Sequence, residues 1–152
     1  MANVNGTEID LFPTEGMKTA AKRYKKWKSE GKGGGTQVAA VRATQIISGR
    51  ELSVDVVMRM HSFFARHEVD KQAEGFNSGE KGFPSRGRVA WDAWGGDAGF
   101  SWSKRKSAAV KKARERFDNG EFTEERPYAN EHAARIRRPE QYDTFRRVAD
   151  RG

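Results

Sequence analysis

The sequence predicts an all-α protein, a compact bundle of about five helices followed by a short helical C-terminal extension. Apolar residues recur at three- and four-residue steps in several segments, which is the period of an amphipathic helix. Serine or threonine precedes most of these segments and can cap a helix there. Strand-like alternation of useful length does not occur. We expect an irregular lead-in over 1–13, a helical domain over 14–120 and the helical extension over 121–152.

The first two helices are expected on either side of a glycine-rich segment. Thr14 can cap the first helix, and the segment 31–35 ends it. Thr36 can cap a second helix, which ends where Gly49 suits a left-handed conformation. The apolar stripe of the first helix consists of Met17, Ala20, Ala21, Tyr24 and Trp27. The expected core residues of the second helix are Val38, Val41, Ile46 and Ile47.

The third helix has the most regular apolar pattern in the chain. Ser53 can cap it, and Asp55 is suitably placed against the positive end of its dipole. The stripe consists of Val56, Val57, Met60, Phe63, Phe64 and His67. We expect this stripe to form the core, with a long polar loop over 68–84 after it. Loops of that length in compact domains are usually functional or mobile.

A fourth and a fifth helix complete the expected domain. Ser85 can cap the fourth helix, which Gly95 and Gly96 interrupt, and Asp97 can cap the fifth. The fourth helix carries Val89, Ala90, Ala93 and Trp94 on its apolar side. One face of the fifth helix carries Trp102, Lys106, Ala109, Val110, Ala113 and Phe117.

Proline residues divide the C-terminal extension. Pro127 and Pro139 leave two short helical pieces, 131–137 and about 140–148. Tyr142 and nearby apolar residues could place a small stripe against the domain.

The charge of the chain favours a polyanionic partner. Its 29 Lys and Arg residues exceed its 21 Asp and Glu residues, giving a formal net charge of +8. The first and fifth helices each have a basic face with few nearby acids, so compensating i,i+4 pairs are largely missing. The residues expected to bind nucleic-acid phosphates are Lys18, Lys22, Lys25 and Lys26 on the first face and Lys104, Arg105, Lys111 and Lys112 on the second. A solvated helix face is the alternative interpretation.

Segment 86–102 contains three tryptophans and one phenylalanine among several glycines. Its aromatic rings could form a stacking platform for bases, or they could belong to the core. Trp94 and Trp102 lie on helical stripes, which favours the core for both. Trp91 lies off the stripe and is therefore the expected exposed aromatic residue. Arg86 and Arg88 lie next to it in sequence and are further expected phosphate-binding residues.

Catalytic and metal-binding patterns are weak. The chain has no cysteine, which excludes disulfides, thiol nucleophiles and thiolate zinc sites. Its 3 histidines match no catalytic motif, and the spacing of His61 and His67 puts them on different sides of a helix. His67, Glu68 and Asp70 could form a hydrolytic site, but a solvated turn fits them better. We therefore expect no enzyme activity, no metal and no cofactor.

Helix–turn–helix recognition and membrane insertion are also disfavoured. The expected third helix begins with the apolar and acidic segment 54–57, whereas a recognition helix exposes polar side chains at its start. The first residues do not resemble a signal peptide. Since no stretch approaches the roughly 20 apolar residues of a spanning helix, we expect no membrane association.

Three stretches, 52–71, 84–99 and 127–139, resemble a domain of tailed-phage proteins, cyanophages included. That domain occurs in the leading region of head-maturation-protease-like and other phage structural gene products. The similarity runs from about Thr14 to the end of the chain. It implies a phage-encoded protein in the host cytoplasm and possibly in the virion. A protease domain would begin beyond Gly152, so the resemblance implies no protease residues in this chain.

Charge and resemblance together predict a non-catalytic binding protein that contacts DNA, RNA or a nucleoprotein or virion assembly. The alternative is an interaction factor that docks on an acidic host protein. A metal-dependent nuclease is a weaker third class, because it would need acidic ligands for its metal. The identity of the partner, any base preference and the oligomeric state stay open.

Overall fold

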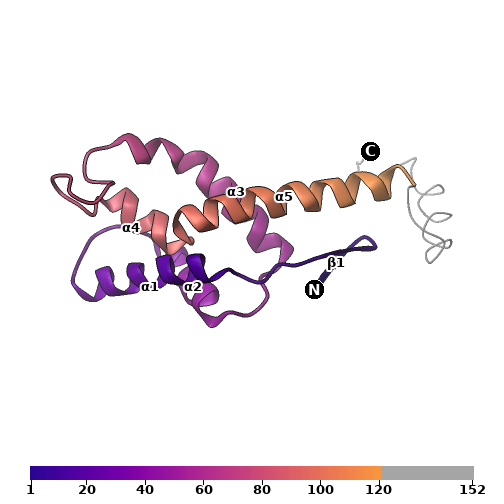
Figure 1. Cartoon of the computed structure of the whole chain (residues 1–152), viewed down its shortest axis with the longest axis horizontal. Helices are drawn as coiled ribbons and strands as arrows, with labels where there is room; N and C mark the ends of the chain where they lie inside the picture. Colours follow the sequence, from indigo (N-terminus) through magenta and orange to yellow (C-terminus); the bar gives the residue numbers. More distant parts are fainter. Residues whose placement is uncertain (121–152) are drawn as a thin grey trace. The chain divides into compact units, whose positions relative to one another are not determined.

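A computed structural model describes residues 1–120 of the protein, and this part is mostly helical (Figure 1). The prediction of a helical fold with about five helices is confirmed. The expected helical extension over 121–152, with its pieces at 131–137 and 140–148, lies outside the described residues. The α-helices within residues 1–120 are α1 (Glu15–Ser29), α2 (Gln37–Ser48), α3 (Val54–His67), α4 (Arg86–Ala93) and α5 (Gly96–Asp118). A 3₁₀ helix, η1 (Glu68–Gln72), follows α3 directly.

A short β-hairpin precedes the helices. Strands β1 (Ala2–Val4) and β2 (Thr7–Ile9) pair in a two-stranded sheet. The turn between them holds Asn5 and Gly6 at φ 51° and 94°, as in the tight turns that favour Asn-Gly. The prediction of an irregular lead-in over 1–13 was therefore wrong for these residues. Each strand is only three residues long, too short to produce a recognisable alternation.

The segment after the hairpin belongs to the core. Leu11 is fully buried, and its carbonyl oxygen accepts a hydrogen bond of 2.9 Å from the backbone N–H of Leu52. Because Leu52 immediately precedes the cap of α3, this bond holds the start of the chain beside the start of that helix.

The chain divides into two compact units. Of the described residues, the first unit contains 1–2 and 9–109, and the second contains 3–8 and 110–120. In the described part of the second unit, the tip of the hairpin is grouped with the last turns of α5. Helices α1 to α4 all belong to the first unit.

Hydroxyl caps set the start of the first four helices, as the sequence predicts. The side-chain oxygens of these caps accept hydrogen bonds from backbone N–H groups in the first turn of each helix. Each cap contributes about 1 kcal/mol to helix stability. The capping residues are Thr14, Thr36, Ser53 and Ser85. Asp97 differs from the prediction, since α5 begins at Gly96 and Asp97 lies in its first turn.

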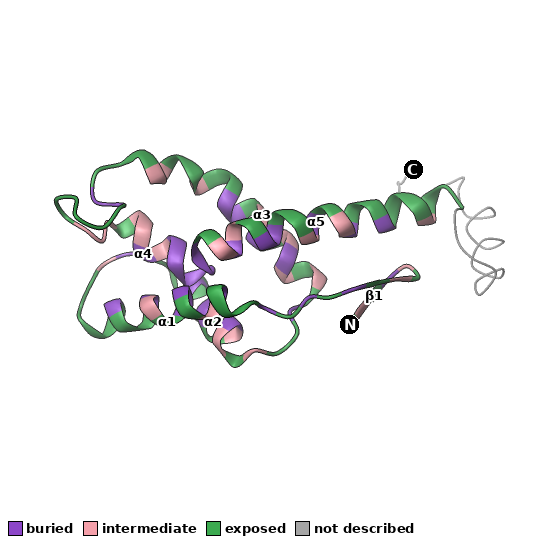
Figure 2. Cartoon of the chain, viewed as in Figure 1, coloured by how far each residue is buried: buried purple, intermediate pink, exposed green. Residues whose placement is uncertain are grey.

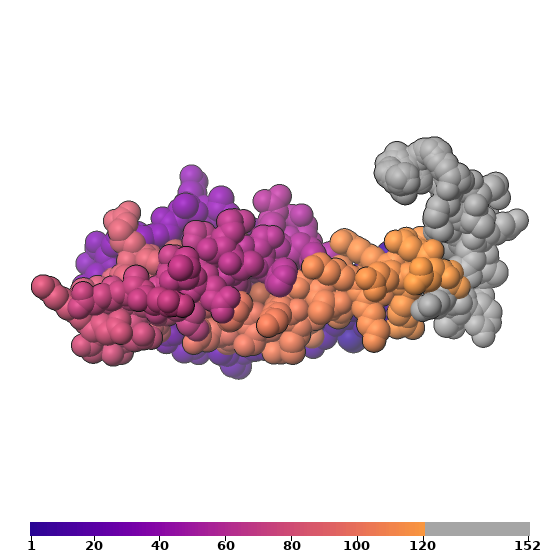
Figure 3. Space-filling view, turned by 90° about the horizontal axis from the view of Figure 1, so that it is seen from above, coloured from indigo at the N-terminus to yellow at the C-terminus, as the bar shows by residue number. Residues whose placement is uncertain are grey.

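Aromatic side chains from three elements form the centre of the core. The prediction that Met60, Phe63 and Phe64 are buried is confirmed, and Figure 2 shows the buried positions along the helices. Phe64 packs against Phe100, with ring centroids 5.5 Å apart, where α3 crosses the first turns of α5 (Figures 1 and 3). Phe76, within the predicted polar loop, is also buried.

Helix α2 presents a different face to the core than expected. Val38 and Val41 are 51% and 50% exposed, so their prediction as core residues was wrong. The buried face carries Ala39, Ala43, Ile46 and Arg42 instead. Small alanine side chains allow α2 to pack closely against α1, which the bulkier valines would prevent.

A buried carboxylate joins α1 to α4. Asp92 accepts hydrogen bonds from Arg23 Nε at 2.6 Å and from Arg88 Nε at 3.1 Å. Nearby, Gly96 has φ 62° and lies so close to α1 that a Cβ atom there would be 2.8 Å from the Cβ of Ala20. The corner between α4 and α5 can therefore sit directly on α1. No helix within residues 1–120 is both long and apolar enough to cross a membrane.

Candidate nucleic-acid interface

The glycine-rich segment 31–35 ends α1 and also lies against the start of α4. Gly34 has φ 122°, and a Cβ atom there would lie 2.5 Å from the carbonyl oxygen of Arg86. Only glycine allows this loop to cross the start of α4 so closely. The guanidinium group of Arg86 in turn lies against Gly33, where no side chain is in its way. The loop and Arg86 together form one end of a groove.

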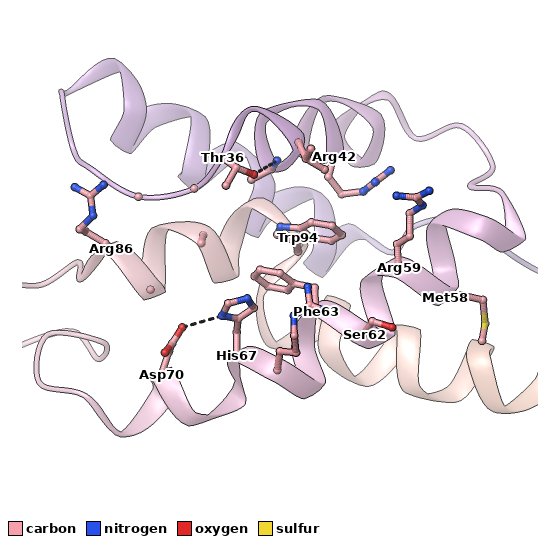
Figure 4. A pocket seen from close by; sticks show the side chains of 17 residues that line it. Thr36, Arg42, Met58, Arg59, Ser62, Phe63, His67, Asp70, Arg86 and Trp94 are labelled. Carbon is pink, nitrogen blue, oxygen red and sulfur yellow. Dashed lines mark hydrogen bonds and ion pairs between the residues drawn. The ribbon is translucent and has the colours of Figure 1, made fainter.

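This groove, which we call the arginine groove, lies between α2, α3 and α4 (Figure 4). Its volume is about 770 Å³, within the range of small-molecule binding sites. Its charged lining residues come from several elements and are dominated by cations. They are Arg42 from α2, Arg59 and Arg66 from α3, Arg86 from α4 and a single acid, Asp70 from η1.

A column of stacked planar groups forms one wall of the arginine groove. The guanidinium carbon of Arg42 lies 4.9 Å from the ring centroid of Trp94. Trp94 stacks on Phe63 with centroids 4.5 Å apart, and Phe63 contacts His67 at 4.6 Å. His67 Nδ1 lies 3.4 Å from the carboxylate of Asp70 at the end of the column. Figure 4 shows Trp94 between Arg42 and Phe63, so both faces of the indole are covered.

Arg42 is the one buried arginine among the four that line the groove. The residue is only 6% exposed. Its Nη1 donates a hydrogen bond to Gln45 Oε1 at 2.6 Å, whereas its buried Nε has no hydrogen-bond partner among the described residues. Burial lowers the pKa of Arg42, the charge of Arg59 lowers it further, and Asp55 opposes both. A buried cation with an unsatisfied donor is unfavourable, so an acceptor from a bound anion would stabilise it.

The remaining arginines lie nearer to solvent. Arg59 Nε pairs with Asp55 at 2.7 Å, and both side chains are largely exposed. Arg66 and Arg86 are exposed and form no ion pair with any described residue. The first turn of α2, capped by Thr36, also lines the groove, and its dipole adds positive potential there. The arrangement is suited to binding anions.

The predicted lysines of α1 lie outside this groove. Lys22 and Lys26 are exposed, as expected for a phosphate-binding face. Lys25 Nζ, however, donates to Thr44 Oγ1 at 2.8 Å, and Lys18 Nζ pairs with Glu15 at 2.9 Å. Two of these four lysines therefore already have partners within the protein.

The predicted basic residues of α5 are all exposed. Lys104 and Arg105 belong to the first compact unit, and Lys111 and Lys112 belong to the second. None of them forms an ion pair with a residue in the described part of the chain.

The prediction of Trp91 as an exposed aromatic residue was wrong. Trp91 is 1% exposed, its Nε1 donates to Asp97 Oδ1 at 2.9 Å, and Lys71 Nζ lies 5.2 Å from its ring centroid. The short helix α4 is covered on several sides, so a position off its main stripe is buried as well. Trp91 has no ring face available for a base.

Arg88 is likewise a structural residue and not the free cation that we predicted. Its Nε donates to the buried Asp92, and its Nη1 donates to the carbonyl oxygen of Phe76 at 2.8 Å. The guanidinium also lies within 6 Å of three aromatic rings, as is typical of cation–π contacts. These rings belong to Trp27, Phe76 and Phe83. Arg86 is the only predicted cation of α4 that lines the arginine groove.

Sequence reasoning missed the other three arginines of the groove. One signal was present at Arg42, which occupies an apolar-stripe position between Ala39, Ala43 and Ile46. Arg59 and Arg66 lie seven positions apart, so they share one side of α3 next to the apolar stripe. The sequence thus signalled a buried arginine on α2, but not that Arg59 and Arg66 would line the same groove.

His61 and His67, the histidines within residues 1–120, belong to no cluster of metal ligands there. Within residues 1–120, no three His, Asp or Glu side chains lie together as metal ligands would. His67 and Asp70 meet at the end of the stacked column, whereas Glu68 is exposed.

No family model, curated protein or solved structure matches this chain. The resemblance to tailed-phage proteins therefore stays a prediction.

Proposed function

We propose that this chain is a non-catalytic nucleic-acid-binding protein that holds backbone phosphates in the arginine groove. The observation that carries the proposal is the convergence of four arginines from three helices on one groove with a single acid. Cations held on rigid helices can release the counterions of a polyanion at little ordering cost. The unsatisfied Nε of Arg42 supports an anionic ligand independently of the charge count.

The proposed binding is independent of base sequence. Single-strand binding proteins commonly stack bases on exposed aromatic rings. Here the faces of Trp94 are covered by Arg42 and Phe63, and Trp91 is buried. Contacts to phosphates position a nucleic acid without reading its bases. The exposed cations of α1 and α5, such as Lys22, Lys26, Lys104 and Arg105, would add further phosphate contacts.

The resemblance to tailed-phage structural proteins supports a proposed setting for this activity. In that setting the protein acts in the host cytoplasm or in the virion, where packaged or replicating nucleic acid is abundant.

A second candidate function is docking on an acidic host protein. It is favoured by Val38 and Val41, two half-exposed valines on α2, of which Val38 lines the arginine groove. Apolar and arginine side chains side by side are common at protein–protein interfaces.

Salt-dependent binding tests the proposal. Affinity for labelled DNA and RNA is measured by fluorescence anisotropy over a range of salt concentrations. Replacing Arg66 and Arg86 by Gln should weaken binding similarly for all base sequences and flatten the log–log salt slope, by about 0.9 for each lost duplex phosphate contact. Arg50→Gln, outside the groove and also exposed, is the matched control and should have a smaller effect.

Failure to bind any nucleic acid at low salt would contradict the proposal and favour an acidic protein partner. Binding that requires a divalent cation, or cleavage of the nucleic acid, would favour a metal-dependent nuclease.

A further inference from the structure

We infer that Arg42 and Arg59 form a site for a phosphomonoester group, the charged end of a nucleic-acid strand. The inference rests on the proposed function, because it specifies which part of a nucleic acid enters the arginine groove. It assigns the groove two functions: Arg42 and Arg59 bind the terminal phosphate, and Arg66 and Arg86 bind the phosphates that follow.

Two like charges face each other in this part of the groove. The guanidinium groups of Arg42 and Arg59 point toward each other in Figure 4, and the charge of Arg59 acts directly on Arg42. Asp55 pairs with Arg59 at 2.7 Å, and Asp70 lies beside His67 at the other end of the stacked column. Asp55 is thus the one carboxylate among the described residues that offsets these two cations. A bound anion would relieve the remaining repulsion.

The hydrogen-bond donors of Arg42 are already held in position. Its Nη1 donates to Gln45, its guanidinium lies over Trp94, and Trp94 is itself stacked on Phe63. Its Nε keeps an unused donor in a buried position. Because the side chain is ordered before binding, a phosphate oxygen that reaches the guanidinium group would gain a charge-assisted hydrogen bond at little entropic cost.

Charge and shape favour the end of a strand over its interior. A phosphomonoester carries about −1.5 to −2 charges at neutral pH and three terminal oxygens. An internal phosphodiester carries a single charge and continues into sugars on both sides. Since Arg42 is only 6% exposed, little of its side chain can be reached from outside, which favours a group at the end of a strand over one within it.

The same phosphomonoester occurs on a strand end and on a free mononucleotide, and the experiment separates the two. Full-length protein is titrated with one labelled single-stranded oligonucleotide in three forms: with a 5′-phosphate, with a 3′-phosphate, and with hydroxyl groups at both ends. An unlabelled nucleoside monophosphate serves as competitor. We expect one phosphorylated form to bind about tenfold more tightly than the hydroxyl form, as a charge-assisted contact allows.

Substitutions of single arginines test whether the phosphomonoester binds at Arg42 and Arg59. Arg42→Lys keeps the charge but loses the Nε donor and the planar fork, so it should abolish the preference for the phosphorylated end. Arg59→Gln should reduce the preference as well, and because this side chain is exposed the variant is expected to fold. Arg50→Gln removes an equal charge elsewhere and should keep the preference. Circular dichroism melts identify any variant that fails to fold, and Arg59→Gln then carries the test alone.

The outcomes separate this inference from the proposed function. Equal affinity for all three ends, or a preference that survives Arg59→Gln, overturns the inference and leaves the proposed function standing. No binding to any oligonucleotide overturns both. Competition by the mononucleotide as strong as by the phosphorylated oligonucleotide supports the phosphomonoester site with a free nucleotide as its ligand.

Discussion

The ring of Phe64 meets the indole of Trp91 edge-on, with centroids 4.7 Å apart. Phe64 lies in the last turn of α3 and Trp91 in α4, so the contact joins two helices that also line the arginine groove. Both side chains are almost fully buried. Aromatic pairs in this geometry stabilise a fold beyond the area that they bury.

Truncating this contact should destabilise the whole domain. Phe64→Ala is expected to lower the free energy of unfolding by about 3–5 kcal/mol, because it removes buried apolar area and leaves a cavity. Val41→Ala, at a position that is 50% exposed, is the control and should cost less than about 1 kcal/mol. Urea denaturation measures both values. A loss for Phe64→Ala as small as that of the control would mean that the core is misassigned.

The glycine loop offers a test of how the arginine groove is built. Gly31 and Gly34 both have positive φ, at 84° and 122°, so an alanine at either position pays a backbone penalty of about 1–3 kcal/mol. A methyl group at Gly31 would meet nothing within 4 Å, whereas at Gly34 it would overlap the backbone of Arg86. Gly34→Ala should therefore lower the melting temperature clearly more than Gly31→Ala. Equal shifts would show that the loop does not press against α4.

The buried carboxylate between α1 and α4 should be important for stability. Burial raises the pKa of Asp92, while hydrogen bonds and charges from Arg23 and Arg88 oppose this shift. Asp92→Ala would leave both guanidinium groups without their acceptor and should cost about 3 kcal/mol. Asp55→Ala removes an exposed pair with Arg59 and should cost less than about 1 kcal/mol. Chemical denaturation at neutral pH measures the free energy of unfolding of the two variants. Equal losses for both would contradict the prediction.

Asp97 should make stability depend on pH in the acid range. Burial by itself raises the pKa of Asp97, but hydrogen bonds from Lys71 and Trp91 and the charge of Lys71 lower it below the ordinary 3.8. A lowered pKa in the folded state means that ionised Asp97 stabilises the protein at neutral pH. This contribution is lost as the pH falls through that lowered value.

Asp97→Asn should therefore lower the melting temperature at neutral pH, and its difference from the unchanged protein should shrink below a pH of about 3.8. Asparagine keeps an oxygen acceptor for Trp91, so the variant tests the charge and not the hydrogen bond. Thermal unfolding followed over this pH range gives the two curves. A difference that stays constant toward low pH would contradict the assignment.

Local signals explain why the helices could be predicted from the sequence. Thr14, Thr36, Ser53 and Ser85 cap the helices that they were expected to cap, and Gly49 ends α2 at φ 75°. In the predicted stripe of α3, Val57, Met60, Phe63 and Phe64 are buried as the period indicates, whereas Val56 and His67 are only half-buried. Caps and periodicity depend on residues within one or two turns of each other, so the sequence alone contains them.

Burial of single side chains depended on partners far away in the chain. Trp91 was expected to be exposed and Val38 to be buried, and both expectations were wrong. The environment of Trp91 is set by Phe64, Phe76 and Asp97, which come from three different segments. A helical period describes one face at a time and does not indicate how many neighbours cover a short helix.

What the sequence by itself determined is the helical class, the helix boundaries and the excess of positive charge. Only the tertiary structure decided where that charge is concentrated. Arg42, Arg59 and Arg86 belong to three helices, and no local pattern relates them. They line one groove because Gly34 lets a loop cross the start of α4 and because Trp94 stacks on Phe63. Contacts of this kind depend on close packing between distant segments, which is a property of the folded chain.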